Sequence, residues 1–195
     1  MCFNCLDTAA GWPTEFNPEL LAQELFGDRI PISSTHLLAT FHTHSPLRKA
    51  LHAIKYQGNK QLAQTLGAIL YRRQAAKMHF DCIVPVPIHL DKIKVRGYNQ
   101  AEEIALGISE SSQLPLLTAL EKVQNTSSQT LLNRKERWEN VADSFQLKDP
   151  QVSNRHILLV DDTLTTGATL EACAEQLLHG GAASISIAAL GYASA

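Results

Sequence analysis

The residues best suited to chemistry form one thirteen-residue segment: Ile157-Leu-Leu-Val-Asp161-Asp162-Thr-Leu-Thr165-Thr166-Gly167-Ala168-Thr169. Its apolar start predicts a short buried strand with the two acids at its end, and the threonine- and glycine-rich turn predicts the start of a helix. Backbone N–H groups at a helix N-terminus lack partners and carry the positive end of the helix dipole, so they favour an anion. The segment therefore predicts a site for a sugar phosphate.

Each residue type in this segment has its own expected task. Threonine hydroxyls can donate hydrogen bonds to phosphate oxygens, and Gly167 allows the backbone to approach the phosphate closely. The carboxylates of Asp161 and Asp162 can accept hydrogen bonds from ribose hydroxyls. The alternative is a buried strand followed by an ordinary polar turn, but that arrangement would place two carboxylates beside an apolar strand without partners, which is costly.

A second cluster is cationic and follows an apolar run that ends in prolines. It reads Val84-Pro-Val-Pro-Ile-His-Leu-Asp-Lys92-Ile-Lys94-Val-Arg96-Gly-Tyr-Asn99-Gln. Lys92, Lys94 and Arg96 are expected in a loop between a strand and a helix, and cations gathered there favour a polyanion such as pyrophosphate. The alternative is an exposed basic loop in which Asn99 merely caps the next helix.

Bulk composition narrows the class of protein. The chain has 195 residues, of which 45% are hydrophobic and 18% charged, as in a globular α/β domain with a substantial core. A net charge of -2 provides no general attraction to nucleic acid or anionic lipid. No apolar run approaches the roughly 20 residues that span a bilayer. The first residues lack the pattern of a signal peptide, so we expect a cytoplasmic protein without a membrane partner.

The cysteines fall into two groups. Cys2 and Cys5 form a Cys-x-x-Cys pair, which is half of the ligand set of a tetrahedral zinc site, and we expect these two residues to be the ligands if Zn²⁺ binds. Cys82 lies in an apolar run and Cys173 in a helical pattern, where both are expected to pack as small hydrophobic residues.

Strands alternate with amphipathic helices along the chain, which predicts a mainly parallel α/β sheet flanked by helices, with ligands at the carboxyl ends of the strands. Strands are expected over residues 35–41 (at a sheet edge), 81–87, 114–117, from 145, over 156–160 and over 184–190. Helices are expected over residues 18–26, 46–55 and 167–179, after Gly58 and after Gly97. We divide the chain into an irregular segment, 1–45, and a main domain, 46–195.

Four motifs along the chain resemble those of the ComF family. This family is related to the type I phosphoribosyltransferases and is associated with DNA uptake and competence. Besides the two clusters above, the motifs are Lys55-Tyr56-Gln-Gly58 and the block from Gln129 to Phe145. The resemblance extends from about residue 47 to residue 192. It implies a type I phosphoribosyltransferase-like fold and an α/β domain that binds 5-phosphoribosyl 1-pyrophosphate (PRPP).

The resemblance also implies roles for individual residues. Residues for the 5′-phosphate are Thr165, Thr166, Gly167, Ala168 and Thr169, and those for the ribose hydroxyls are Asp161 and Asp162. Residues for pyrophosphate are Lys55, Lys92, Lys94, Arg96 and Arg137. Asp161, Asp162 and Arg137 would be catalytic in a pentosyl transfer of nucleotide metabolism. A nucleophile, which the sequence does not identify, would displace pyrophosphate from ribose C1, with Mg²⁺ on PRPP oxygens.

Several alternatives stay open. The basic segment around Arg137 is either a loop that closes over pyrophosphate or a solvated helix. The domain is either an enzyme or a non-catalytic PRPP-fold module of DNA uptake, with nucleic acid, DNA-uptake proteins or further copies of the chain as partners. A single-stranded DNA binder ranks last, since only 6% of residues are aromatic. Family members commonly begin with a four-cysteine zinc ribbon, so either this ribbon is lost here or the start lies upstream of Met1.

Overall fold

The computed structural model describes residues 17–40, 45–74, 79–124 and 144–193. The helices in these ranges are α2 (Pro18–Phe26), α3 (Pro46–Tyr56), α4 (Lys60–Gln74), α5 (Leu90–Arg96), α6 (Gln100–Ser112) and α8 (Ala168–His179), with a short 3-10 helix at Pro150–Val152. The strands are β1 (Ile32–Thr40), β2 (Cys82–Pro85), β3 (Leu120–Lys122), β4 (Phe145–Leu147), β5 (His156–Leu164) and β6 (Ser184–Tyr192).

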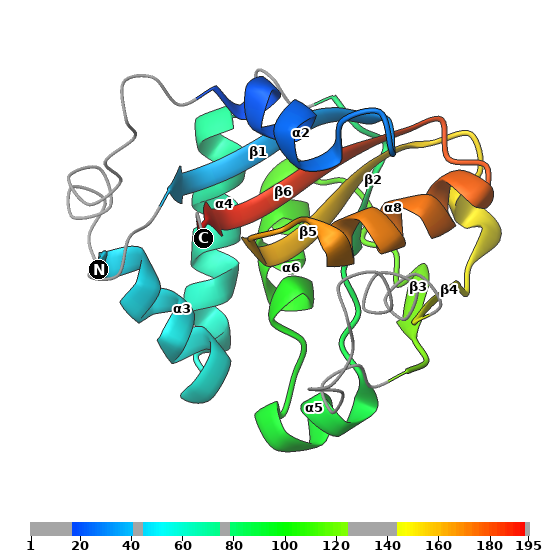
Figure 1. Cartoon of the computed structure of the whole chain (residues 1–195). Helices are drawn as coiled ribbons and strands as arrows, with labels where there is room; N and C mark the ends of the chain where they lie inside the picture. Colours follow the sequence, from blue (N-terminus) through cyan, green and yellow to red (C-terminus); the bar gives the residue numbers. More distant parts are fainter. Residues whose placement is uncertain (1–16, 41–44, 75–78, 125–143, 194–195) are drawn as a thin grey trace, which may run out of the picture.

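The main sheet has four parallel strands in the order β1-β6-β5-β2, which confirms the predicted mainly parallel α/β fold (Figure 1). Strand β1, from the segment before residue 46, pairs with β6 along most of its length. The predicted strand at residues 114–117 is reduced to a single parallel bridge between Leu116 and Ile83. A second, two-stranded antiparallel sheet joins β3 to β4, and β4 begins at Phe145 as predicted.

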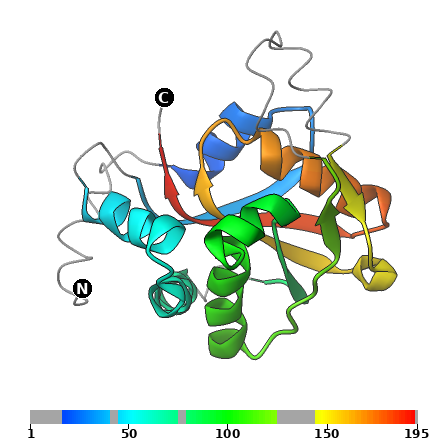
Figure 2. The same cartoon turned by 90° about the horizontal axis from the view of Figure 1, so that it is seen from below.

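Helices cover both faces of the main sheet (Figure 2). Because side chains alternate along a strand, Ile157 and Leu159 of β5 enter the core beneath α2 and α8. Leu158 and Val160 enter a second core with α3, α4 and α6. The side chains from Ile157 to Val160 are all buried, so packing on both faces holds the strand that carries the acidic pair.

Helices α4 and α6 approach each other through glycine. A Cβ at Gly67 would lie 2.1 Å from the Ile104 carbonyl oxygen, and a Cβ at Gly107 would lie 1.9 Å from that of Gln64. Such distances leave no room for any side chain, so these two glycines set the separation of the helices. Helix α6 carries Asn99 and Gln100 at its start, and its position therefore fixes one wall of the cleft described below.

Strand β5 is longer than predicted. It continues through the acidic pair to Leu164, whereas the sequence suggested an end at Val160. The reason is its neighbour: β6 keeps pairing with β5 as far as Leu164 and Tyr192, while pairing with β2 stops at Pro85 and Val160. The acids thus lie beyond the end of β2 but inside β5.

Residues 90–96, expected as a loop, form helix α5. His89 caps its start by accepting from the Asp91 N–H, and Gly97 ends it in the left-handed conformation at φ 81°. None of its residues is buried, so the helix lacks the buried apolar face that a sequence pattern usually reveals. In the described part of the chain, no helix is long and apolar enough to cross a membrane.

Candidate functional site

A cleft of about 200 Å³ opens at the carboxyl ends of β2 and β5. Its charged lining residues are Lys55, Lys92, Arg96, Lys122, Asp161 and Asp162, and its polar ones are His89, Asn99, Gln100 and Thr169. They come from α3, α5, α6, β3, β5 and α8. Segments distant in sequence therefore meet at the edge of the sheet where ligands of parallel α/β folds bind.

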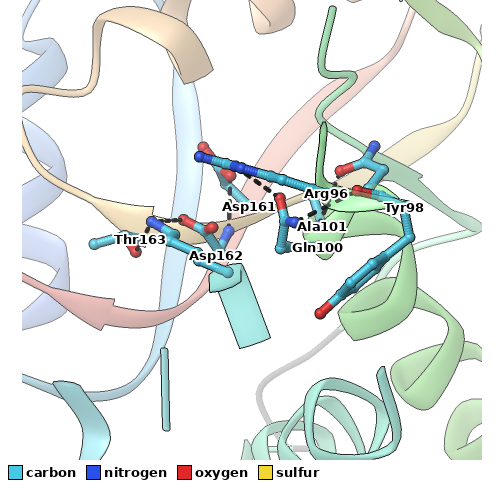
Figure 3. A network of polar contacts seen from close by, with 9 residues as sticks. Arg96, Tyr98, Gln100, Ala101, Asp161, Asp162 and Thr163 are labelled. Carbon is cyan, nitrogen blue, oxygen red and sulfur yellow. Dashed lines mark hydrogen bonds and ion pairs between the residues drawn. The ribbon is translucent and has the colours of Figure 1, made fainter. Parts of the chain in front are cut away.

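The two acids line this cleft as consecutive residues of β5 (Figure 3). Asp161 follows the side of Ile157 and Leu159, and Asp162 follows that of Leu158 and Val160, because neighbouring strand residues alternate between faces. The Asp162 N–H donates to Asp161 Oδ1 at 2.7 Å. The pair thus offers carboxylate oxygens to both sides of one strand end.

Asp162 has a direct cationic partner. Lys55, in the last turn of α3, places its Nζ 3.0 Å from Asp162 Oδ1 and 3.4 Å from Thr163 Oγ1. The expectation that Lys55 contacts the site rather than only the end of its own helix therefore agrees with its position. Lys55 therefore lies in the last turn of α3 and also contacts Asp162.

Asp161 has a different electrostatic environment. Burial and the neighbouring charge of Asp162 raise the pKa of Asp161 to about 7, although the Asp162 N–H, Lys55 and Lys122 act in the opposite direction. A carboxyl group with a pKa this high changes its charge near neutral pH. Its protonation state will therefore respond to any anion or cation that enters the cleft.

The cations of α5 divide between the cleft and the solvent. Lys92 and Arg96 line the cleft. The side chain of Lys94 is 78% exposed, and its Nζ lies 3.4 Å from Asp91 Oδ1, so the structure does not bring Lys94 to the cleft. Arg96 Nη1 donates to Gln100 Oε1 at 3.0 Å (Figure 3).

Asn99 joins the end of β2 to the start of α6. Its side-chain oxygen accepts from the Ala101 N–H at 3.1 Å, and its amide nitrogen donates to the Val86 carbonyl at 3.0 Å. The predicted helix cap is therefore confirmed. The second hydrogen bond holds the backbone after β2 against α6, which fixes both walls of the cleft at once.

Lys122 lines the cleft but was not singled out from the sequence. It is the last residue of β3, a strand of three residues that is too short to show a period. The pairing of β3 with β4 is a tertiary contact that local sequence does not reveal. Burial and the charge of Lys92 lower the pKa of Lys122.

The threonine- and glycine-rich turn enters α8 as predicted. Gly167 is the N-cap residue at φ 79°, without a side-chain capping hydrogen bond, a conformation that favours glycine. A Cβ at Gly167 would lie 2.8 Å from the Phe26 ring of α2, so side-chain size is limited there as well. Thr169 lines the cleft, while Thr165 and Thr166 are exposed in the turn next to Ala168.

Three candidate site residues, Arg137, Cys2 and Cys5, lie outside the described residues. Cys82 and Cys173 are buried free cysteines, which confirms their prediction as packing residues. Among the described residues, no group of three or more histidines, cysteines or acids is arranged to hold a metal ion.

Comparison with known proteins finds a matching family model and several relatives. Residues 56–195 match the family model for the phosphoribosyl transferase domain. The chain is 31% identical over 155 residues to competence protein F of Haemophilus influenzae, covering 75% of this chain and 68% of that protein. It is 30% identical over 149 residues to DNA utilization protein YhgH of Escherichia coli, covering 73% and 65%.

A more distant relative is competence protein ComFC of Bacillus subtilis, which is 28% identical over 144 residues, with coverage of 72% of this chain and 57% of that protein. The chain therefore spans roughly two thirds of the length of the first two relatives and less of the third.

Proposed function

The chain belongs to the ComF family of phosphoribosyltransferase-like proteins, and from that premise we propose that it binds PRPP and displaces pyrophosphate from ribose C1. The observation that carries the proposal is the cleft itself. Four cations and two carboxylates line it at the carboxyl ends of β2 and β5, beside the turn that opens α8. A ligand with hydroxyl groups in its middle and phosphate at both ends matches this distribution of charge.

The sugar end is assigned to β5 and the start of α8. In this proposal the ribose 2′- and 3′-hydroxyls donate to Asp161 and Asp162. The 5′-phosphate accepts from the backbone and hydroxyl groups of the turn from Thr165 to Thr169. The absence of a side-chain cap at Gly167 supports this assignment, because it leaves N–H groups of the helix start available to an anion.

The pyrophosphate end is assigned to α5. Lys92 and Arg96 would neutralise the diphosphate, and Lys55, which already contacts Asp162, would connect the two halves of the site. Arg137, in the segment outside the described residues, is proposed to close over the diphosphate. Positive charge preorganised around a leaving group stabilises the charge that develops on it in the transition state.

The proposed reaction is a substitution at C1: the bond between C1 and the pyrophosphate oxygen breaks, and a bond from C1 to the incoming nucleophile forms. Mg²⁺ bound to PRPP oxygens would neutralise part of the leaving group's charge. The task of Asp161 and Asp162 in this scheme is to orient the ribose.

A non-catalytic role is the second candidate, and the relatives named for competence and DNA utilization favour it. In that case the cleft would bind PRPP as a regulatory ligand of a DNA-uptake apparatus. A binding pocket does not establish turnover. Release of pyrophosphate from PRPP, assayed with a panel of amines and nucleobases, separates the two: release supports the enzyme, and binding without release across the panel supports the module.

Calorimetry tests the pocket assignment directly. Asp161→Asn/Asp162→Asn should abolish PRPP–Mg²⁺ binding, because the ribose hydroxyls lose charged acceptors that contribute about 1.5–3 kcal/mol each. Asp28→Asn is the matched control, since Asp28 is an exposed acid between α2 and β1. Circular dichroism reports whether each variant is folded. Unchanged affinity in a folded double variant would contradict the assignment.

A further inference from the structure

Lys122 is a cleft residue that belongs to none of the motifs in the sequence. We propose that Lys122 binds the diphosphate of the ligand together with Lys92, so that the small β3–β4 sheet supplies a second cationic contact besides α5. This inference rests on the proposed function. It assigns the diphosphate an additional residue, and it gives the two-stranded sheet a task in binding.

The surroundings of Lys122 support a ligand-binding role. Its Nζ lies 4.8 Å from the centre of the Phe145 ring, and Phe145 is its partner across the strand pair. Among the described residues, Lys122 has no hydrogen bond and no ion pair within 4.0 Å. A partly buried ammonium without an anionic partner is unfavourable, so its head group is available to an anion in the cleft.

The titratable groups that face Lys122 come from three elements. They are Lys92 from α5, Asp161 from β5 and the thiol of Cys173 from α8. Burial raises the pKa of Cys173, so this thiol supplies no negative charge at neutral pH. Two ammonium groups near each other are unfavourable, and an anion that contacts both removes this repulsion. Lys92 likewise has no ion pair with a described residue. A diphosphate carries several acceptor oxygens, so it can contact both lysines at once.

An ion pair with Asp161 is the alternative explanation for a lysine at position 122. A structural ion pair between them would explain a lysine at this position without any ligand, but among the described residues they are not within 4.0 Å of each other. Asp162, by comparison, has its lysine at 3.0 Å. The two acids thus differ: Asp162 forms an ion pair with Lys55, whereas Asp161 and Lys122 line the same cleft without forming one.

The first test is calorimetry of three ligands, Mg²⁺–pyrophosphate, PRPP–Mg²⁺ and ribose 5-phosphate, with the full chain. Lys122→Met should weaken binding of both diphosphate ligands by about tenfold or more, because a charged hydrogen bond is lost. Ribose 5-phosphate, which has no diphosphate, should change less than about twofold. Methionine keeps the packing on Phe145, so the fold should survive.

Two further variants separate binding from structure. Lys122→Arg keeps a cation and should retain most of the affinity for pyrophosphate. Lys148→Met is the matched control, since it removes the same charge from an exposed position next to β4 and should leave all three ligands unaffected. Thermal unfolding of each variant shows whether a loss of affinity comes from a damaged fold.

The pH dependence provides a readout that packing alone would not change. Burial and Lys92 lower the pKa of Lys122, so deprotonation at alkaline pH should weaken pyrophosphate binding to the unmodified protein. The Lys122→Arg protein, whose guanidinium stays charged, should lose affinity less over the same pH range. Identical pH profiles would contradict a role for the ammonium.

The outcomes distinguish this inference from the function on which it rests. If the unmodified protein binds neither PRPP nor pyrophosphate, the proposed function fails. If it binds both, and Lys122→Met binds them equally well, only the role of Lys122 fails. Equal loss of all three ligands in Lys122→Met would overturn the diphosphate assignment, because the residue would then support the cleft as a whole.

Discussion

At the scale of single residues, two adjacent aspartates have opposite relations to their surroundings. Asp162 is paired with Lys55 at 3.0 Å, whereas burial and Asp162 raise the pKa of Asp161 to about 7. A carboxyl group with a raised pKa in a cleft is typical of functional positions, where the ligand supplies the missing interaction. The free protein should therefore be destabilised by one acid and stabilised by the other.

Asp161→Asn should raise the melting temperature at pH 8 by a few degrees. For a chain of this size, each kcal/mol of unfolding free energy corresponds to about 2–4 °C. In the unfolded chain the carboxyl has its ordinary pKa of 3.8, while the folded value is about 7. The folded state thus binds more protons between these values, and stability falls as pH rises through this window. Asparagine removes the effect, so the gain should vanish near pH 4. Melting temperatures measured from pH 4 to 8 provide the test.

Asp162→Asn is the matched comparison and should have the opposite sign when it is made in the Asp161→Asn protein, where it cannot also relieve the charge repulsion on Asp161. Removing this carboxylate leaves Lys55, whose side chain is 27% exposed, without its partner, and the expected loss is about 1 kcal/mol at pH 8. Two destabilised variants would contradict the different roles assigned to the neighbours.

Two lysines of α5 should differ although they are two positions apart. Lys92 lines the cleft, and Lys94 is exposed beside Asp91. Lys92→Ala should weaken pyrophosphate binding by about tenfold or more, as expected for one charged hydrogen bond. Lys94→Ala should have little effect, as is usual for exposed pairs. Calorimetry with Mg²⁺–pyrophosphate distinguishes them, and equal losses would restore the original assignment of Lys94.

At the scale of elements, the site depends on how closely helices α4 and α6 pack. Gly67 and Gly107 each face a carbonyl oxygen of the other helix at about 2 Å from an added Cβ. Asn99, at the start of α6, is hydrogen-bonded to the backbone after β2. Any movement of α6 is therefore transmitted to the cleft wall.

Gly67→Ala should destabilise the protein by about 1–3 kcal/mol, although alanine is the better helix former. The added methyl group would force the helices apart, because backbone atoms of Ile104 occupy its place. Thr65→Ala, at an exposed position of α4, is the control and should be neutral or slightly stabilising. Denaturant unfolding measures both. A stabilised Gly67→Ala protein would contradict the close packing.

At the scale of the whole molecule, the turn from Thr165 to Gly167 is supported by a segment far away in sequence. Phe26 of α2 is 1% exposed and packs against Gly167. Arg29, shortly after α2, contacts Glu171 of α8 at 2.9 Å. The region before residue 46 thus contributes packing to the site as well as strand β1 to the sheet.

A ligand held by so many elements should stabilise the entire fold. At 100 times its dissociation constant, PRPP–Mg²⁺ should add about 2.7 kcal/mol, or roughly 5–11 °C in melting temperature. Ribose 5-phosphate at the same concentration should add less, since it lacks the diphosphate contacts. Thermal unfolding with millimolar ligand measures both, and an unchanged transition would argue against an intact PRPP site.

Local sequence was sufficient for the features that depend on neighbouring residues. The strand before the acidic pair, the helix that begins after Gly167 and the Asn99 cap were all predicted, because apolar periodicity, glycine and capping side chains act over a few residues. The alternation of these elements predicted the mainly parallel sheet. The motif from Ile157 to Thr169 also predicted a phosphate site. The structure places Asp161, Asp162 and Thr169 of this motif on the cleft, while phosphate binding stays a prediction.

Tertiary structure decided what depends on partners distant in the chain. Strand β5 extends to Leu164 because β6 continues beside it, and helix α5 has no buried face that a pattern could show. Lys122 reaches the cleft through the pairing of β3 with β4, while Lys94 points to solvent two residues from Lys92. Charge and exposure at a site are set by everything packed around it, and the order of residues along one segment does not contain that information.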